Sequence, residues 1–254
     1  MKIDKVIMAT DLNEEYIGFW NVVSKVWKEE IGIEPVLYVI SDKKVNYLSE
    51  QHGKVHYYSP EKSIATSHQA QVIRHFAAAQ FPNDNCIITD IDMMPLNRGY
   101  YTALAQPAKE EDVIIYSADA YPPGHPSHPA FPMCYICAKG STFLEIIGGN
   151  IDNFSTNIHK WMDAGFGWST DEKYFYHLLE KWSKNEGQGR IVLYRRGFNS
   201  GDHTNMHRID RSEHPYYDLG KLESGGYIDY HMPRPFSKYG DFINNILKHN
   251  RTEY

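Results

Sequence analysis

The chain of 254 residues is poor in cysteine and lacks any long hydrophobic run. Its three cysteines are an odd number, which fits a reducing environment better than a disulfide framework, and we expect all three to be buried structural residues. No stretch approaches the ~20 apolar residues needed to cross a bilayer, and the charged residues 1–5 lack a signal-peptide apolar core. We therefore expect a soluble, cytoplasmic protein without a transmembrane segment.

The chain also lacks an excess of basic residues and two common phosphate-binding motifs. Lys and Arg number 26 against 32 Asp and Glu, for a net charge of −6, so no basic face is available for a nucleic-acid partner. Neither G-x-G-x-x-G nor G-x-x-x-x-G-K-[ST] follows the first expected strand. This weighs against ordinary dinucleotide-binding folds and P-loop enzymes.

The hydrophobic pattern of the first half alternates between strand and helix. Apolar runs predict strands at 5–10, 35–40, 54–58 and 86–89. Helices are predicted from residue 14 to the stop at Gly32, and over 66–81, where apolar residues recur at helical spacing. Such alternation is typical of a largely parallel sheet covered on both faces.

The second half shows more strands and helices but no obvious linker or repeat. Strands are expected at 112–116, 133–138, 190–195 and 227–231, and helices at 141–147, 152–164, 170–184 and 239–249. The proline-rich residues 121–132 cannot form a helix or a central strand and are expected to form a stiff loop. We predict one α/β domain over residues 1–254, with a mostly parallel central sheet flanked by helices.

An acidic pair, Asp90 and Asp92, follows the expected strand at 86–89. In an extended strand the two carboxylates would point the same way and Ile91 into the core. Two carboxylates close together repel each other, and a divalent cation relieves that repulsion. Mg²⁺ and Mn²⁺ favour such oxygen ligands and often bridge to substrate phosphates. The alternative is an ordinary acidic turn at the end of a strand.

Four short motifs make the chain resemble a known enzyme family. They are Ala-Thr-Asp-Leu-Asn at 9–13, Thr-Asp-Ile-Asp-Met-Met-Pro-Leu at 89–96, Trp-Ser-Thr-Asp-Glu at 168–172 and Asp-Tyr-His-Met-Pro-Arg-Pro at 229–235. The chain resembles the GT-A-fold (Rossmann-like) glycosyltransferases, which use nucleotide-sugar donors and an Asp-x-Asp metal site. Among them it is similar to the small soluble enzymes of large algal viruses. The resemblance implies a nucleotide-sugar-binding half at 1–98 and an acceptor-binding half at 99–254 that ends in a metal-ligand segment.

The resemblance also implies roles for individual residues. Thr10 and Asp11 would border the nucleoside pocket. Asp90, Asp92 and His231 would form the metal site, in which Asp92 binds Mn²⁺ or Mg²⁺ directly. Asp90 would face the ribose or a metal-bound water, and His231 would be the third protein ligand. A merely structural role for His231 is the alternative.

Three basic residues are candidates for donor binding. The resemblance places a diphosphate-binding lysine beyond the histidine, where this chain has Lys238, with Arg234 between the two. Arg74 lies at the edge of the apolar face of the 66–81 helix, from which it could reach a sugar or phosphate. The alternative for Arg74 is a solvated flanking arginine.

Asp171 and Glu172 are the candidates for the catalytic carboxylate. An inverting transfer needs a base to take the proton from the acceptor hydroxyl. The competing explanation is structural, because Ser169 and Glu172 have the spacing of a capping box and acids are favoured in the first turn of a helix. Since that explanation covers Glu172 better, we predict Asp171 as the base or sugar-binding carboxylate, with Glu172 in reserve.

The sequence favours a metal-dependent glycosyltransferase that moves a sugar from a nucleoside diphosphate, UDP by family frequency, to a hydroxyl acceptor such as a glycan. Loop 121–132 would contact the acceptor, the alternative being an ordinary stiff surface loop. Tyr121, Trp161 and Trp168 could stack on sugars if they are not core residues. One alternative is a sugar-phosphate nucleotidyltransferase, although acidic residues stand at 11–15 where such enzymes carry a basic glycine-rich loop. The other is a non-catalytic carbohydrate-binding protein.

Overall fold

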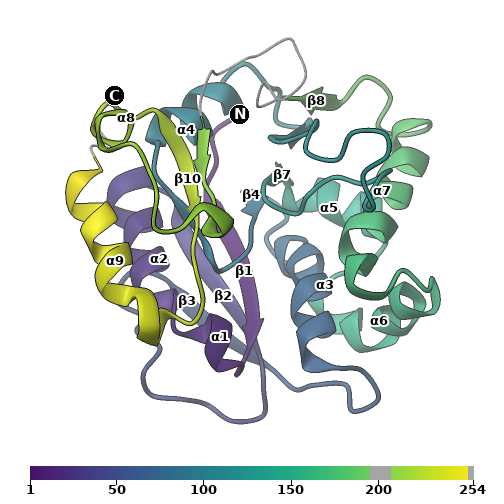
Figure 1. The fold of residues 1–254 in the computed structure, drawn as a ribbon. Helices are drawn as coiled ribbons and strands as arrows, with labels where there is room; N and C mark the ends of the chain where they lie inside the picture. The colour runs from purple at the N-terminus through teal and green to yellow at the C-terminus, as the bar shows by residue number, and fades with distance from the viewer. Residues whose placement is uncertain (195–206, 251–254) are drawn as a thin grey trace.

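The computed structural model describes residues 1–194 and 207–250, and a seven-stranded sheet lies at its centre (Figure 1). The strand order is β3-β2-β1-β4-β7-β6-β8. Strands β3, β2, β1 and β4 run parallel to one another, as do β6 and β8, whereas β7 is antiparallel to both of its neighbours. The bounds are β1 Lys5–Asp11, β2 Glu34–Ile40, β3 Lys54–Tyr58, β4 Asn85–Ile88, β6 Val113–Ile115, β7 Ile136–Lys139 and β8 Ile191–Leu193. The predicted mostly parallel α/β sheet is therefore confirmed. Arg195, at the end of one expected strand, lies outside the described residues.

A second sheet of three short strands packs beside the first. It consists of β5 (Met93–Pro95), β10 (Tyr227–His231) and β9 (His207–Ile209) in the order β5-β10-β9. Strand β10 is antiparallel to β5, with His231 opposite Met93, and parallel to β9. Only β10 was predicted, because β5 and β9 are too short to show a period-two pattern. This sheet places His231 next to the residues that follow the acidic pair.

Helices cover both faces of the central sheet (Figure 1). Alternate strand residues face opposite ways, so Val6 and Met8 join one hydrophobic cluster while Ile7 joins the other. The first cluster packs against α2 (Trp20–Lys25), the π-helical turn η1 (Val26–Ile31) and α9 (Phe236–His249). The second packs against α3 (Thr66–Ala78), α5 (Gly140–Ile147), α6 (Phe154–Asp163) and α7 (Thr170–Ser183). The remaining elements are α1 (Glu14–Ile17), α4 (Arg98–Ala105), α8 (Leu219–Glu223) and the 3₁₀ turns η2 (Ile151–Asn153), η3 (Gly167–Ser169) and η4 (Arg211–Glu213).

The first predicted helix is divided in the structure. Helix α1 ends at Gly18, where an added Cβ would lie 3.1 Å from the Cβ of Phe236, so the chain passes close to α9 here. The helical region then continues through α2 and η1 to Gly32, whose φ of 84° gives the left-handed conformation that glycine adopts without strain. The predicted stop is confirmed, whereas the single continuous helix is not.

The cysteines agree with the sequence-based expectation. Cys86, Cys134 and Cys137 are all buried, and none of them forms a disulfide. None of the helices within the described ranges is long and apolar enough to cross a membrane.

Candidate active site

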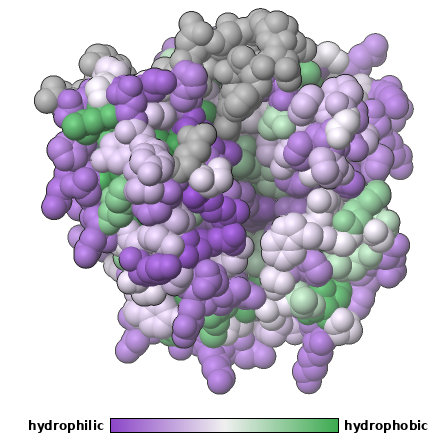
Figure 2. Space-filling view, viewed as in Figure 1, coloured by the Kyte–Doolittle hydropathy of each residue, from purple (hydrophilic) through white to green (hydrophobic). Residues whose placement is uncertain are grey.

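A cleft of about 730 Å³ lies at the carboxyl ends of β1 and β4, the edge at which open α/β sheets usually bind ligands. Hydrophilic side chains gather at the centre of the face shown in Figure 2, between the two helical layers. All of the predicted site residues except one line the cleft: Thr10, Asp11, Arg74, Asp90, Asp92, Asp171, Glu172, His231 and Arg234.

Lys238 is the exception. It lies in the first turn of α9, exposed to solvent, with its ammonium group 4.9 Å from the centre of the Tyr239 ring. Because α9 begins immediately after Pro235, the helix turns Lys238 away from the cleft. Lys238 therefore does not line the cleft, whereas Arg234, the other candidate for binding the diphosphate, does.

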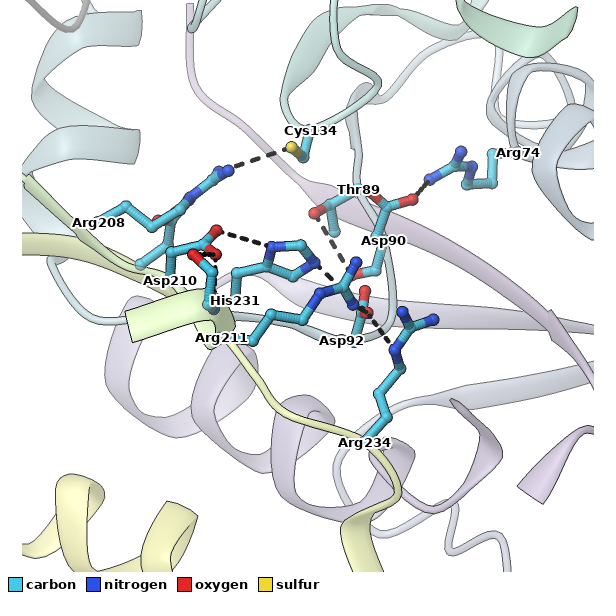
Figure 3. A network of polar contacts seen from close by, with 12 residues as sticks. Arg74, Thr89, Asp90, Asp92, Cys134, Arg208, Asp210, Arg211, His231 and Arg234 are labelled. Carbon is cyan, nitrogen blue, oxygen red and sulfur yellow. Dashed lines mark hydrogen bonds and ion pairs between the residues drawn. The ribbon is translucent and has the colours of Figure 1, made fainter. Parts of the chain in front are cut away.

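The acidic pair forms a turn and not the end of a strand. Strand β4 ends at Ile88, and the amide of Met93 donates to the carbonyl of Asp90 at 3.3 Å. Ile91 is buried as predicted, but the two carboxylates contact different cations (Figure 3). The expected period-two alignment is wrong because the chain turns here to enter the second sheet.

Three cationic side chains surround a single oxygen of Asp92. Its Oδ2 lies 3.0 Å from Nη1 of Arg211, 3.6 Å from Nε2 of His231 and 3.8 Å from Nε of Arg234. Only 5% of the Asp92 side chain is exposed, so these cations replace the water that would otherwise solvate its charge. Asp92 and His231 thus meet as the sequence predicted, in the company of an arginine that it did not predict.

His231 is oriented by Asp210, a second residue that sequence reasoning missed. The Asp210 Oδ2 lies 3.0 Å from Nδ1 of His231, which leaves Nε2 facing Asp92. Burial by itself would lower the pKa of His231, but its contacts with Asp210 and Asp92 outweigh burial and raise the pKa to about 9. A carboxylate behind an imidazole is the usual way to fix the orientation of a histidine ligand.

The short second sheet holds Asp210 and Arg211 in place. Arg208 in β9 makes two 2.7 Å bonds to the buried Asp229 in β10. Asp210 then caps turn η4, since its Oδ1 accepts from the amide and the hydroxyl of Ser212 at 2.9 and 2.7 Å. No pattern around β9 points to this arrangement, because three residues are too few to reveal a strand.

The donor set fits a divalent cation, although no cage is formed. Two carboxylates and an imidazole are suitable ligands for Mn²⁺ or Mg²⁺. Asp92 Oδ2 and His231 Nε2 face each other, while Asp90 is paired with Arg74. In the described part of the chain no group of three His, Cys, Asp or Glu side chains is arranged as a metal site. The predicted Mn²⁺ or Mg²⁺ cofactor therefore stays a prediction.

Arg74 connects the acidic pair to the other end of the cleft. Helix α3 places its guanidinium, only 3% exposed, between Asp90 and Asp171, and Nη2 lies 2.8 Å from Asp171 Oδ2. Arg74 is thus a buried bridge and not a solvated flanking residue. Its two carboxylate partners offset the cost of burying the Arg74 charge.

Asp171 and Glu172 lie at the start of α7 in different environments. Ser169 makes no side-chain capping bond, so the predicted capping box is not formed, and Oε1 of Glu172 instead accepts from the Tyr121 hydroxyl at 2.6 Å. Burial raises the pKa of Asp171 to about 6, although the Arg74 charge opposes it. Burial and then the neighbouring Asp171 raise the pKa of Glu172 to about 7. The capping box is therefore ruled out as the reason for Glu172, whereas both acids do lie in the first turn of α7, as the helix-dipole explanation requires.

Aromatic side chains at the cleft differ in their accessibility. Trp168 is 61% exposed, and its ring lies 5.8 Å from that of His68. Tyr121 stacks on His125 at 4.6 Å within the proline-rich loop. Trp161, by contrast, is buried in the core behind α3 and cannot meet a ligand. Tyr121 and Trp168 remain candidates for stacking on a sugar.

Thr10 and Asp11 lie where β1 opens into the cleft. Thr10 is buried, and both oxygens of Asp11 are bonded within the protein. Oδ1 accepts from the amide of Asn13 at 3.1 Å, and Oδ2 accepts from the hydroxyl of Thr66 at 2.7 Å. These two hydrogen bonds hold Asp11 at the wall of the cleft. The predicted contact of Thr10 and Asp11 with a nucleoside stays a prediction.

A scan against protein-family models and a search of curated proteins found no match. Among solved structures, the chain is similar to galactosyltransferase LgtC in complex with donor and acceptor sugar analogues, at 9% identity over 95% of each chain with a TM-score of 0.49. A glycosyltransferase involved in glycosylation of the major capsid of PBCV-1 aligns over 94% of this chain and 98% of its own, at 8% identity and a TM-score of 0.44. The bifunctional glycosyltransferase WbbM aligns over 99% of this chain and 52% of its own, at 11% identity and a TM-score of 0.47. At TM-scores under 0.5, function has to be argued from the side chains of the cleft.

Proposed function

We propose that the protein is a metal-dependent glycosyltransferase that moves a sugar from a nucleoside diphosphate sugar, UDP-linked, to an acceptor hydroxyl on a glycan. One observation carries the proposal: a single cleft has the Asp92 and His231 pair with two arginines at one end and the carboxylates Asp171 and Glu172 at the other. The first group suits a metal-bound diphosphate, and the second suits a sugar and its acceptor.

In this proposal, four regions of the cleft would bind the nucleoside, the diphosphate, the transferred sugar and the acceptor. The nucleoside would lie against the end of β1 and Tyr16, and the diphosphate beside Asp92, Arg211 and Arg234. The transferred sugar would contact the charged group of Arg74 and its carboxylate partners. The acceptor would enter past Trp168, whose exposed ring offers a stacking surface.

The reaction needs stabilisation of a leaving group and removal of one proton. The acceptor oxygen forms a bond to the anomeric carbon as the bond from that carbon to the diphosphate breaks, and the nucleoside diphosphate departs with the electron pair. Arg211 and Arg234, which both contact Asp92, would stabilise this negative charge, so the leaving group would need no general acid. A metal ion at Asp92 would supply further charge stabilisation there when bound.

Glu172 is the better candidate for the base. Asp171 is held in an ion pair by Arg74, whereas Glu172 has a neutral hydroxyl partner in Tyr121. A base works best when its pKa lies near the working pH, and the pKa of Glu172 is about 7. We therefore assign proton removal to Glu172 and sugar contact to Asp171 with Arg74, the reverse of the order favoured from sequence.

The test is a panel of nucleotide sugars with Mn²⁺ or EDTA, read by released nucleotide in the wild type and in Asp92→Ala. We expect one donor to be turned over with Mn²⁺, and activity to fall by at least about 100-fold with EDTA or in the variant. Asp163→Ala, the same change at an exposed carboxylate at the end of α6, is the matched control and should keep full activity.

Other outcomes would identify the alternatives. Full activity of Asp92→Ala would overturn the proposed metal site. Consumption of a nucleoside triphosphate with a sugar phosphate would identify a nucleotidyltransferase. Sugar binding that EDTA does not affect, without donor turnover, would identify a carbohydrate-binding protein.

A further inference from the structure

Each carboxylate of the acidic pair is held by an arginine from another part of the chain. Asp90 is paired with Arg74, and Asp92 with Arg211, whose Nη1 lies 3.0 Å from Asp92 Oδ2. Each carboxylate thus already faces a cation, and among the described residues the predicted ligands form no metal cluster. A divalent ion could bind Asp92 fully only if the guanidinium of Arg211 moved aside.

The surroundings of Arg211 allow its side chain to move while the neighbouring residues stay in place. Its side chain is 32% exposed, compared with 3% for Arg74, so water can replace its lost contact. It is the first residue of turn η4, which is capped by Asp210 through two hydrogen bonds. The same Asp210 also holds His231, so a swing of the Arg211 side chain leaves the imidazole oriented toward Asp92.

Arg234 contacts the same oxygen but is arranged differently. Its Nε lies 3.8 Å from Asp92 Oδ2, and its guanidinium carbon lies 4.5 Å from the centre of the Tyr16 ring. This cation–π contact engages Arg234 against the wall of the cleft, and the contact with Asp92 is the longest of the three. Arg234 is therefore a fixed cation, and Arg211 is the one whose removal most exposes the Asp92 charge.

We propose that Arg211 is a displaceable counter-cation, which pairs with Asp92 in the metal-free protein and turns to the nucleoside diphosphate when a divalent ion takes Asp92. The inference rests on the proposed function, since it assumes that a metal and a diphosphate share this end of the cleft. The planar guanidinium suits both partners, because it forms paired hydrogen bonds to carboxylates and to phosphates alike.

This exchange couples metal binding to nucleotide binding. With no diphosphate present, the metal has to displace Arg211 and leave it unpaired. With a diphosphate present, Arg211 gains a new partner, so the metal binds more tightly. The coupling is reciprocal, and the metal must raise the affinity for the diphosphate by the same factor.

The experiment measures binding and not turnover. Calorimetric titrations with Mn²⁺ alone, UDP alone and UDP in saturating Mn²⁺ are made on the wild type and on Arg211→Gln. We expect the variant to bind Mn²⁺ alone about tenfold more tightly, because it no longer has to break an ion pair of roughly the strength of a charged hydrogen bond. We also expect it to bind UDP in Mn²⁺ about tenfold more weakly than the wild type.

Two further variants separate this exchange from simpler effects. Arg234→Gln is the matched control and should weaken UDP binding without tightening the binding of Mn²⁺ alone. Arg211→Lys keeps a cation beside Asp92 but loses the paired hydrogen bonds, so Mn²⁺ binding should stay near wild type while UDP binding weakens. The lysine variant also serves if Arg211→Gln does not fold, as judged by circular dichroism.

Opposite effects on the two ligands support the proposal. It is overturned if Arg211→Gln leaves the affinity for Mn²⁺ alone unchanged or lowers it, or if Arg234→Gln raises that affinity equally. If the wild type still binds Mn²⁺ with UDP in that case, the proposed function survives and only the exchange fails. If neither the wild type nor Arg211→Gln binds Mn²⁺, both the exchange and the proposed metal site are refuted.

Discussion

His75 gives a prediction about stability that depends on no assumption about the substrate. It lies on α3 next to Arg74, is fully buried, and stacks on Phe175 at a ring distance of 4.5 Å. Neither ring nitrogen has a hydrogen-bond partner within the described part of the chain. Burial, and next the Arg74 charge, hold the pKa of His75 well below its usual value. Replacement by Phe removes the titrating group while keeping an aromatic ring in the apolar pocket.

The size of the effect follows from the linkage between protonation and folding. His75 stays neutral in the folded protein but takes up a proton in the unfolded chain below a pKa of about 6.5. Above pH 6.5 the protonation of His75 therefore costs no stability. Below that value the free energy of unfolding falls with pH, because only the unfolded chain takes up the proton. The loss approaches about 1.4 kcal/mol per pH unit and amounts to about 2 kcal/mol between pH 8 and pH 5.

Urea unfolding of the wild type and of His75→Phe at pH 8.0, 6.5 and 5.0 measures this loss. The difference in unfolding free energy between the variant and the wild type should shift by about 2 kcal/mol in favour of the variant on going from pH 8 to pH 5. The shift is independent of the packing change, which contributes equally at all three pH values. His159→Phe, at an exposed position of α6, should show no such shift. A constant difference for His75→Phe would refute a neutral buried histidine.

Three further predictions concern the cleft. Tyr121→Phe removes the hydroxyl that lowers the pKa of Glu172, so the rising limb of the plot of kcat/KM against pH should move to higher pH. A limb that does not move would exclude Glu172 as the base. Trp168→Ala should raise the acceptor KM by about 2- to 10-fold while thermal unfolding changes little, because the ring is exposed; an unchanged KM would remove it from the acceptor site. Arg74→Met should destabilise the fold by about 3–5 kcal/mol in urea unfolding, since it leaves Asp171 buried without its partner, and a loss under about 1 kcal/mol would contradict that pairing.

Long, strongly patterned segments could be predicted from sequence, whereas short ones could not. The apolar runs of β1 and β2 and the helical repeat of α3 fall within a few residues of their predicted places. Strands β5 and β9 were missed because three residues carry too little periodicity to be recognised. The antiparallel course of β7 was missed as well, since strand direction is not encoded in a local pattern.

The candidate site shows the same division between local pattern and long-range contact. Asp92 was found because it follows an apolar run, which predicts the edge of a sheet, whereas His231 came only from the resemblance to an enzyme family. Asp210 and Arg211 follow a strand that no pattern revealed. Glu172 was ranked below Asp171 because the spacing to Ser169 predicted a capping box that the helix does not form.

The sequence by itself determined the α/β class, the two apolar faces of the sheet and the set of charged residues at its edge. Those features follow from local periodicity, which each segment carries on its own. Only the tertiary structure decided which charge meets which. Arg211 pairs with Asp92 across 119 residues, and Arg74 with Asp171 across 97. Ion pairs depend on distance and on exclusion of water, and both are defined only once distant segments have packed together.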